Sequence, residues 1–198
     1  LICAPTEAKR WWIGGLGLLL SAVLLTGYFI PVSVPVMDLS ASSAFADAAY
    51  YETIHAGKQQ NVAADFRVKK YRLDFSMGLN LTGSAKVYVD RSELKSYRFT
   101  LYHGYKVKQV TDQTGAALDF RREYDYVTVT RGEAAVEYLC LEYTGKSPKY
   151  YSSYAGVCLP ANFAYYPIPG YRELFKDNFY GFIDCSLPYD TAFVVRFR

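Results

Sequence analysis

The chain has 198 residues, of which 22 are Lys or Arg and 19 are Asp or Glu, so its formal net charge is +3. This excess of positive charge is too small and too scattered to indicate a nucleic-acid partner. The length allows one domain with a hydrophobic core, and the 20 Tyr and 12 Phe residues favour β structure.

An apolar segment runs from Trp11 to Ile30 without a charged side chain. A helix rises 1.5 Å per residue, so about 20 such residues cross a hydrocarbon core of about 30 Å. The segment therefore predicts one transmembrane helix at 11–30, surrounded by membrane lipid. Gly17 and Ser21 form a small-residue pair that is typical of contact with other transmembrane segments of the same protein.

The charges that flank this segment predict its orientation in the cell membrane. Lys9 and Arg10 directly precede it, and no Lys or Arg follows until Lys58. Because positive residues favour the cytoplasmic side, we expect residues 1–10 to be a short cytoplasmic segment and the C-terminal part to be extracellular. The first residues are apolar and do not begin with Met, which favours a larger polytopic protein.

A cleavable signal peptide is the alternative to the transmembrane helix. Ala44-Phe45-Ala46 has the small-x-small form of a cleavage site. The apolar run exceeds the usual ~7–15 residues of a signal peptide and ends well before this site, so we favour the transmembrane helix.

Residues 31–65 are predicted to be an extracellular tether with a short helix. Pro31 and Pro35 interrupt a helical continuation, and small residues follow at 41–49. A short helix is expected within 50–60, ending near Gly57. His55 falls in this helix and is expected at the surface, because no other ligand residue lies at metal-binding spacing.

From Phe66 the hydrophobic residues follow a period of two, which is typical of strands with one face in a core. The pattern predicts strands, separated by turns, over 66–77, 81–90, 97–101, 107–110, 118–120, 124–129 and 136–145. Short strands at this spacing favour an antiparallel β-sandwich over βαβ units. The predicted fold class is therefore mainly β, with a β-sandwich ectodomain at 66–198 preceded by one transmembrane helix.

The sequence predicts no catalytic, metal-binding or cofactor-binding residues. The only histidines, His55 and His103, are 48 positions apart, which excludes a two-histidine zinc helix. No nucleophile motif is present. The acid pairs Asp119 with Glu123 and Glu133 with Glu137 are expected in turns and on solvated faces.

The four cysteines match no zinc-binding spacing. Cys3 is predicted on the other side of the membrane from Cys140, Cys158 and Cys185. Three thiols leave at least one unpaired, so the sequence allows either free thiols, which we favour, or a single disulfide.

Tyrosines are interleaved with the prolines Pro160, Pro167 and Pro169 between residues 150 and 171. Exposed aromatic rings on loops bind sugars, peptides or other protein surfaces, but the same rings can also cover the open end of a sandwich. The candidate binding surface consists of Tyr150, Tyr151, Tyr154, Tyr165, Tyr166 and Tyr171.

The order of the predicted strands resembles the N-terminal β-sandwich domain of aminopeptidase N-type zinc peptidases. That domain has a Tyr-x-Leu-x-Phe-like first strand, a Gly-containing second strand and a later strand that ends in Tyr-x-Gly. The matching positions, within about 66–190, are Tyr71, Leu73, Phe75, Gly83, Leu101, Val107, Val110, Tyr143 and Gly145. The His-Glu-x-x-His zinc motif of these peptidases lies in a later domain and does not occur here.

Together with the predicted helix, the chain resembles bacterial ABC transporter permeases that carry an outside domain similar to this sandwich. This second resemblance also rests on Lys149 to Ser153 and on Leu159 to Gly170. It implies a non-catalytic extracellular accessory domain that acts in recognition or assembly, with an ATPase subunit as partner. The alternatives are the N-terminal non-catalytic domain of a membrane-bound zinc aminopeptidase and a free-standing membrane-anchored binding protein.

Overall fold

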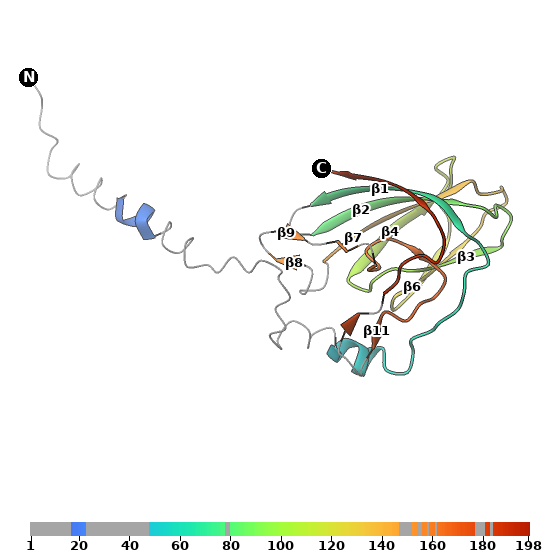
Figure 1. The fold of residues 1–198 in the computed structure, drawn as a ribbon. Helices are drawn as coiled ribbons and strands as arrows, with labels where there is room; N and C mark the ends of the chain where they lie inside the picture. The colour runs from blue at the N-terminus through green and yellow to red at the C-terminus, as the bar shows by residue number, and fades with distance from the viewer. Residues whose placement is uncertain are drawn as a thin grey trace, which may run out of the picture. The chain divides into compact units, whose positions relative to one another are not determined.

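The computed structural model describes most of the C-terminal part of the chain and one short N-terminal stretch (Figure 1). The chain divides into two units, Leu1–Val34 and Pro35–Arg198. The described residues are 17–22, 48–77, 80–146, 152–153, 156–157, 159–160, 162–176, 181–182 and 184–198.

In the first unit, residues 17–22 are helical and the side chains of Leu18, Leu19 and Leu20 are exposed. The rest of the predicted transmembrane helix, 11–16 and 23–30, lies outside the described residues, as do residues 1–10 and 31–47. Within the described part of the chain, no helix is both long enough and apolar enough to span a membrane. The transmembrane helix therefore stays a prediction.

The second unit is mainly β, as predicted, and begins with one turn of helix. This π-helix, η1, spans Tyr50–Ile54, within the region where a short helix was expected. The seven strands that follow it are β1 Val68–Met77, β2 Leu81–Val89, β3 Ser96–Thr100, β4 Tyr105–Thr111, β5 Phe120–Glu123, β6 Tyr126–Thr130 and β7 Tyr138–Gly145. All seven overlap strands that the sequence predicted.

Two principal sheets contain these strands. The larger has the order β13-β1-β2-β7-β4 and the smaller has the order β10-β3-β6-β5. Strand β10 spans Ile168–Pro169 and β13 spans Ala192–Phe197. Short pairs lie outside these sheets, namely β8 Ser152–Ser153 with β9 Gly156–Val157, and β11 Phe175–Lys176 with β12 Gly181–Phe182.

One hydrophobic core is shared by both sheets, which gives a sandwich-like arrangement. The alternation in the sequence produces it: on β1, Tyr71, Leu73 and Phe75 are buried while the residues between them face outward. The smaller sheet contributes Tyr97 and Phe99 from β3, and Val127 and Val129 from β6. Phe66 packs edge-on against both β3 rings.

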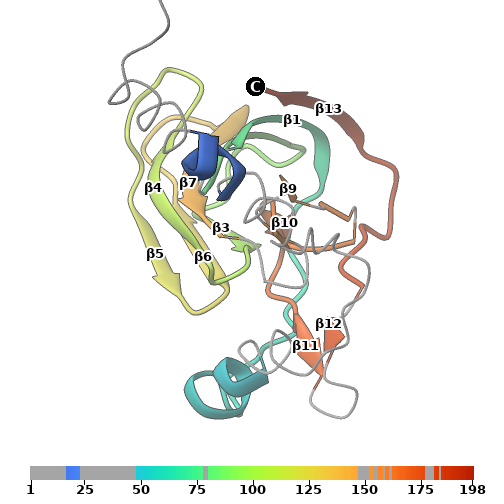
Figure 2. The same ribbon diagram turned by 90° about the vertical axis from the view of Figure 1, so that its left-hand side faces the viewer.

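Strand β13 departs from the predicted antiparallel pattern. It pairs with β1 in parallel, Tyr71 lying opposite Phe193 and Phe75 opposite Phe197, at the edge of the larger sheet (Figure 2). Parallel neighbours require a long connection, and here most of the chain separates the two strands. All six residues of β13 are exposed, although the rings of Phe193 and Tyr71 stack with centroids 4.9 Å apart.

Gly83 on β2 makes room for a buried ring of the neighbouring strand. It lies opposite Tyr143 of β7, and a Cβ added at Gly83 would meet the Tyr143 ring at 2.6 Å. The Tyr143 hydroxyl donates a hydrogen bond of 2.9 Å to the carbonyl oxygen of Tyr165, so the ring cannot move away freely. The tight packing of the core at this point requires glycine.

We predict that Gly83→Ala lowers the free energy of unfolding by about 1–3 kcal/mol, because the added methyl group overpacks the core against Tyr143. Urea unfolding measures this loss. Gly132→Ala is the matched control, since its Cβ would meet only a Leu118 methyl group at 3.6 Å. Equal stability of the two variants would contradict the packing described here.

Candidate functional site

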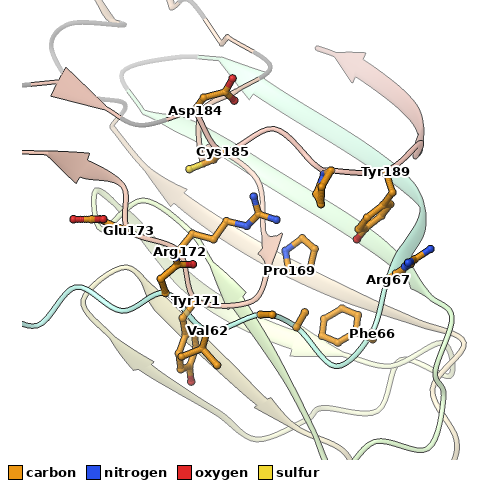
Figure 3. Close-up of a pocket in the computed structure, with 14 residues that line it drawn as sticks. Val62, Phe66, Arg67, Pro169, Tyr171, Arg172, Glu173, Asp184, Cys185 and Tyr189 are labelled. Atoms are coloured by element: carbon orange, nitrogen blue, oxygen red, sulfur yellow. The ribbon is translucent and has the colours of Figure 1, made fainter.

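A cavity of about 500 Å³ opens where three segments of the second unit meet (Figure 3). The segments are 61–67, which leads into β1, 169–173, which begins with the last residue of β10, and 184–189, which precedes β13. The lining residues are Asn61, Val62, Ala63, Ala64, Phe66, Arg67, Pro169, Tyr171, Arg172, Glu173, Asp184, Cys185, Pro188 and Tyr189. Its volume is in the range of small-molecule sites.

Gly170 fixes the central segment of the cavity wall. Its φ is +86°, which only glycine adopts readily, and an added Cβ would lie 2.6 Å from the carbonyl oxygen of Val62. This close approach lets Val62 and Tyr171 form a bridge of two backbone hydrogen bonds, of 2.7 and 2.8 Å. The bridge holds the first two segments side by side.

Thr100 on β3 holds the backbone of Gly170 and Arg172 in place. Its hydroxyl donates to the Gly170 carbonyl oxygen and accepts from the backbone N–H of Arg172, both at 2.8 Å. The Arg172 guanidinium then donates from Nη1 to the carbonyl oxygen of Ser186 at 3.1 Å, which connects the second segment to the third. The backbone of Arg172 is therefore fixed before any ligand arrives.

Charges of both signs line the cavity. Figure 3 shows the Arg172 side chain extending between Cys185 and Pro169, with Glu173 and Arg67 at opposite sides. The Asp184 carboxylate accepts the backbone N–H of Ser186 at 2.8 Å, and hydrogen bonds from Ser186 lower the pKa of Asp184.

Cys185 is buried beside the cavity and has a free thiol. Burial raises the pKa of Cys185 to about 12, so the thiol is protonated near neutral pH and is a poor nucleophile. Cys140 is also free, which confirms the expectation of free thiols for these two residues, whereas Cys158 lies outside the described residues.

A buried carboxylate, Asp125, lies in the turn between β5 and β6. One carboxylate oxygen accepts from the Tyr51 hydroxyl at 3.0 Å and the other accepts from the backbone N–H of His103 at 2.7 Å. The His103 ring lies 3.3 Å from the same oxygen. Burial lowers the pKa of the nearby Arg122 to about 10, and the negative charge of Asp125 opposes this shift.

Tyr51, His103 and Arg122 form a cluster around the buried Asp125, to which His55 also belongs. His55 is completely buried, so the expectation that it lies at the surface is wrong. Its Nε2 lies 4.0 Å from an Asp125 oxygen, and the Tyr124 ring packs edge-on against it with centroids 4.7 Å apart. Neither ring nitrogen of His55 has a hydrogen-bond partner among the described residues. Burial lowers the pKa of His55, and the Asp125 charge opposes this shift.

Tyr126 connects the cluster around Asp125 to the cavity, because it lies next to His55 and packs against the cavity residue Tyr171. The Tyr126 ring packs against Tyr171 with centroids 4.7 Å apart, and the Tyr171 hydroxyl hydrogen-bonds to Thr128. Burial raises the pKa of Tyr126 to about 12, so its hydroxyl stays protonated and donates to the Gln60 carbonyl oxygen. Among the described residues, no group of three or more His, Cys, Asp or Glu side chains is arranged to hold a metal ion.

The structure describes three members of the predicted aromatic surface. Tyr165 and Tyr166 are buried in the core, and Tyr171 is half-buried at the cavity. The other three, Tyr150, Tyr151 and Tyr154, lie outside the described residues. A binding role for this set stays a prediction.

The acidic residues that the sequence singled out are solvated, as expected. Asp119, Glu133 and Glu137 are exposed, and Glu123 forms an exposed ion pair with Arg121. Sequence reasoning did not single out Asp125, Arg67 or Arg172. Asp125 has one local signal, since it stands between two tyrosines at a turn separating two strands.

We predict that Tyr51→Phe lowers the free energy of unfolding by about 1.5–3 kcal/mol, because Asp125 loses a hydrogen bond to its charged carboxylate. Urea unfolding provides the measurement. Tyr88→Phe is the matched control, because Tyr88 is a half-buried residue of β2 packed against Tyr138. A loss no larger than that of the control would show that the Tyr51 hydroxyl does not stabilise Asp125.

The buried His55 makes the stability of the folded chain depend on pH. Because burial lowers the pKa of His55 in the folded chain, the unfolded chain binds the proton first as the pH falls. The contribution of His55 is present above the ordinary histidine pKa of about 6.5 and is lost as the pH falls below it.

We therefore expect His55→Phe to flatten the decline in unfolding free energy between about pH 7.5 and about pH 5.5. Urea unfolding at several pH values measures the slope. His103→Phe is the comparison, because it removes a histidine from the same cluster and leaves His55 in place. An unchanged slope in His55→Phe would refute the prediction.

No protein-family profile matches the chain. No curated protein matches its sequence either. Among solved structures, it is similar to a mutant M1 zinc metallopeptidase from Deinococcus radiodurans, with 21% identity and a TM-score of 0.43 over 67% of this chain and 32% of that chain.

A two-domain M1 zinc metallopeptidase mutant bound to L-tryptophan is similar at 22% identity and a TM-score of 0.44, over 70% of this chain and 33% of that chain. Native leukotriene A4 hydrolase from Saccharomyces cerevisiae gives 13% identity and a TM-score of 0.32, over 48% of this chain and 18% of that chain. The chain spans a third or less of the length of these proteins, and likeness at this level establishes neither a family nor a function.

Proposed function

We propose that this chain is a non-catalytic extracellular accessory domain of a membrane transporter permease, acting in recognition or assembly. The observation that carries the recognition role is the cavity of about 500 Å³ with Arg172 extending into it. The membrane location rests on the uncharged segment from Trp11 to Ile30. An ATPase subunit is the partner that this role implies.

The construction of the cavity supports recognition. Polar groups held in place by a folded scaffold are typical of ligand sites, and here the backbone bonds of Val62, Tyr171 and Arg172 fix the walls. The buried and protonated thiol of Cys185 adds shape to the site but no reactive group.

The alternative role is the N-terminal non-catalytic domain of a membrane-bound zinc aminopeptidase. One observation favours it: Gly83 and Tyr143, two positions of the resemblance, lie opposite each other on β2 and β7 and pack closely. This contact supports the type of domain that the resemblance implies.

We predict that a fusion of alkaline phosphatase after Arg198 is active in a bacterial host and sediments with the membranes. The enzyme folds only outside the cytoplasm, so activity reports an extracellular C-terminal part. A green fluorescent protein fusion at the same position is the converse reporter and is expected to be dark. Lys9→Gln combined with Arg10→Gln is expected to reduce the orientation bias.

Two outcomes would contradict this proposal. A bright fluorescent fusion with an inactive phosphatase would place the domain in the cytoplasm. An active but soluble phosphatase would indicate a cleaved signal peptide. The permease and peptidase roles are separated by the native reading frame on both sides of the segment, where further apolar spans support the first and a His-Glu-x-x-His helix supports the second.

A further inference from the structure

We propose that the cavity beside Tyr171 binds a carboxylate group joined to an apolar or aromatic moiety, with Arg172 as its principal contact. This inference rests on the proposed recognition function and names its ligand. The carboxylate can belong to a small organic acid or to the C-terminus of a peptide.

The Arg172 guanidinium offers the cavity a positive charge. The side chain is half-buried, and its hydrogen bond within the described residues goes to the neutral carbonyl oxygen of Ser186. No carboxylate of the described part of the chain forms an ion pair with it. A guanidinium carries five N–H donors in a planar fork that matches a carboxylate, and burial makes an anionic partner favourable.

The charge of Arg172 helps to lower the pKa of Asp184, but no hydrogen bond or ion pair among the described residues joins Arg172 to either nearby acidic residue, Asp184 or Glu173. Asp184 is exposed and accepts its hydrogen bond from the Ser186 backbone. Figure 3 shows the Glu173 side chain pointing to the side of the cavity away from the Arg172 guanidinium. The guanidinium is therefore available to a ligand in the middle of the cavity.

Arg67 and Tyr189 form the opposite wall of the cavity. The Arg67 guanidinium lies over the Tyr189 ring, 5.5 Å from its centroid. The Tyr189 hydroxyl accepts the backbone N–H of Val68 at 3.0 Å, which fixes the ring at the beginning of β1. Arg67 adds a second positive charge on this side, and the Tyr189 ring adds apolar surface to the lining of the cavity.

The size of the cavity and the rest of its lining suit an apolar group. Phe66, Val62 and Pro169 provide apolar surface next to the two arginines. A volume of about 500 Å³ accommodates a group the size of an aromatic amino acid or of a few C-terminal residues of a peptide. The positive charge of Arg172 and the apolar surface around it favour a ligand in which a carboxylate is joined to a hydrophobic group.

The test is equilibrium dialysis of the 198-residue chain in detergent against N-acetyl-L-phenylalanine and N-acetyl-L-phenylalanine amide, at up to about 1 mM probe. The two probes differ only in the carboxylate charge. We expect the acid to bind at least about tenfold more tightly than the amide, which is the factor that one charge-assisted hydrogen bond represents. Equal binding of the two probes, or no binding of the acid, overturns the proposal.

Arg172→Gln is expected to weaken binding of the acid by about tenfold or more. Arg72→Gln is the matched control, because Arg72 is exposed on β1 and does not line the cavity. Unweakened binding in Arg172→Gln overturns the assignment. If that variant does not fold, the comparison of acid and amide on the unaltered chain still decides.

A third probe, N-acetyl-Gly-Gly-L-phenylalanine, distinguishes the two sources of the carboxylate. Tighter binding of this peptide than of N-acetyl-L-phenylalanine indicates a peptide C-terminus, and weaker binding indicates a small acid. The dialysis result is independent of the reporter fusions, which measure only the side of the membrane. A failure of the ligand assignment and a failure of the proposed location are therefore separate results.

Discussion

The fold of the second unit depends on how it accommodates one buried negative charge. Asp125 is almost fully inaccessible to water, so its carboxylate requires partners from the protein. Tyr51 comes from η1 and His103 from the connection between β3 and β4, so the carboxylate joins segments that are distant in the sequence. Figures 1 and 2 both place η1 beside β11, and the Tyr51 and Phe175 rings stack there with centroids 4.8 Å apart.

The same constraint positions the cavity. The chain leaves η1 through Gln59, whose side chain accepts from the backbone N–H groups of Leu174 and Phe175 and donates to the Phe175 carbonyl oxygen. Gln60 then donates its backbone N–H to the Tyr126 hydroxyl at 2.6 Å. Residues 61–67, the first segment of the cavity lining, come directly after Gln60 in the chain. The Asp125 carboxylate, which is hydrogen-bonded within the protein, thus helps to position the segments that form the cavity walls. Arg172 lies on one of these segments, with N–H donors available for a ligand.

The sequence predicted β1 to β7 because their inward residues alternate, as Tyr71, Leu73 and Phe75 do on β1. It did not predict β13, because Ala192–Phe197 shows no alternation and its partner lies far away in the chain, although its Val and Phe content was an available signal. The site was less predictable. The burial of His55 depends on Asp125, 70 positions later, and the cavity is lined by both Arg67 and Arg172, which are far apart in the sequence. No local pattern reports such arrangements.

The aromatic core has a consequence for alkaline conditions. Burial holds the pKa of Tyr71 and that of Tyr143 well above the ordinary phenol value of about 10. The folded chain therefore retains protons that the unfolded chain releases as the pH rises through that value. The stability that these tyrosines contribute is present below about pH 10 and is lost above it. A core built on phenols makes the domain labile to base, whereas a core of the same size built on phenylalanine would be indifferent to it.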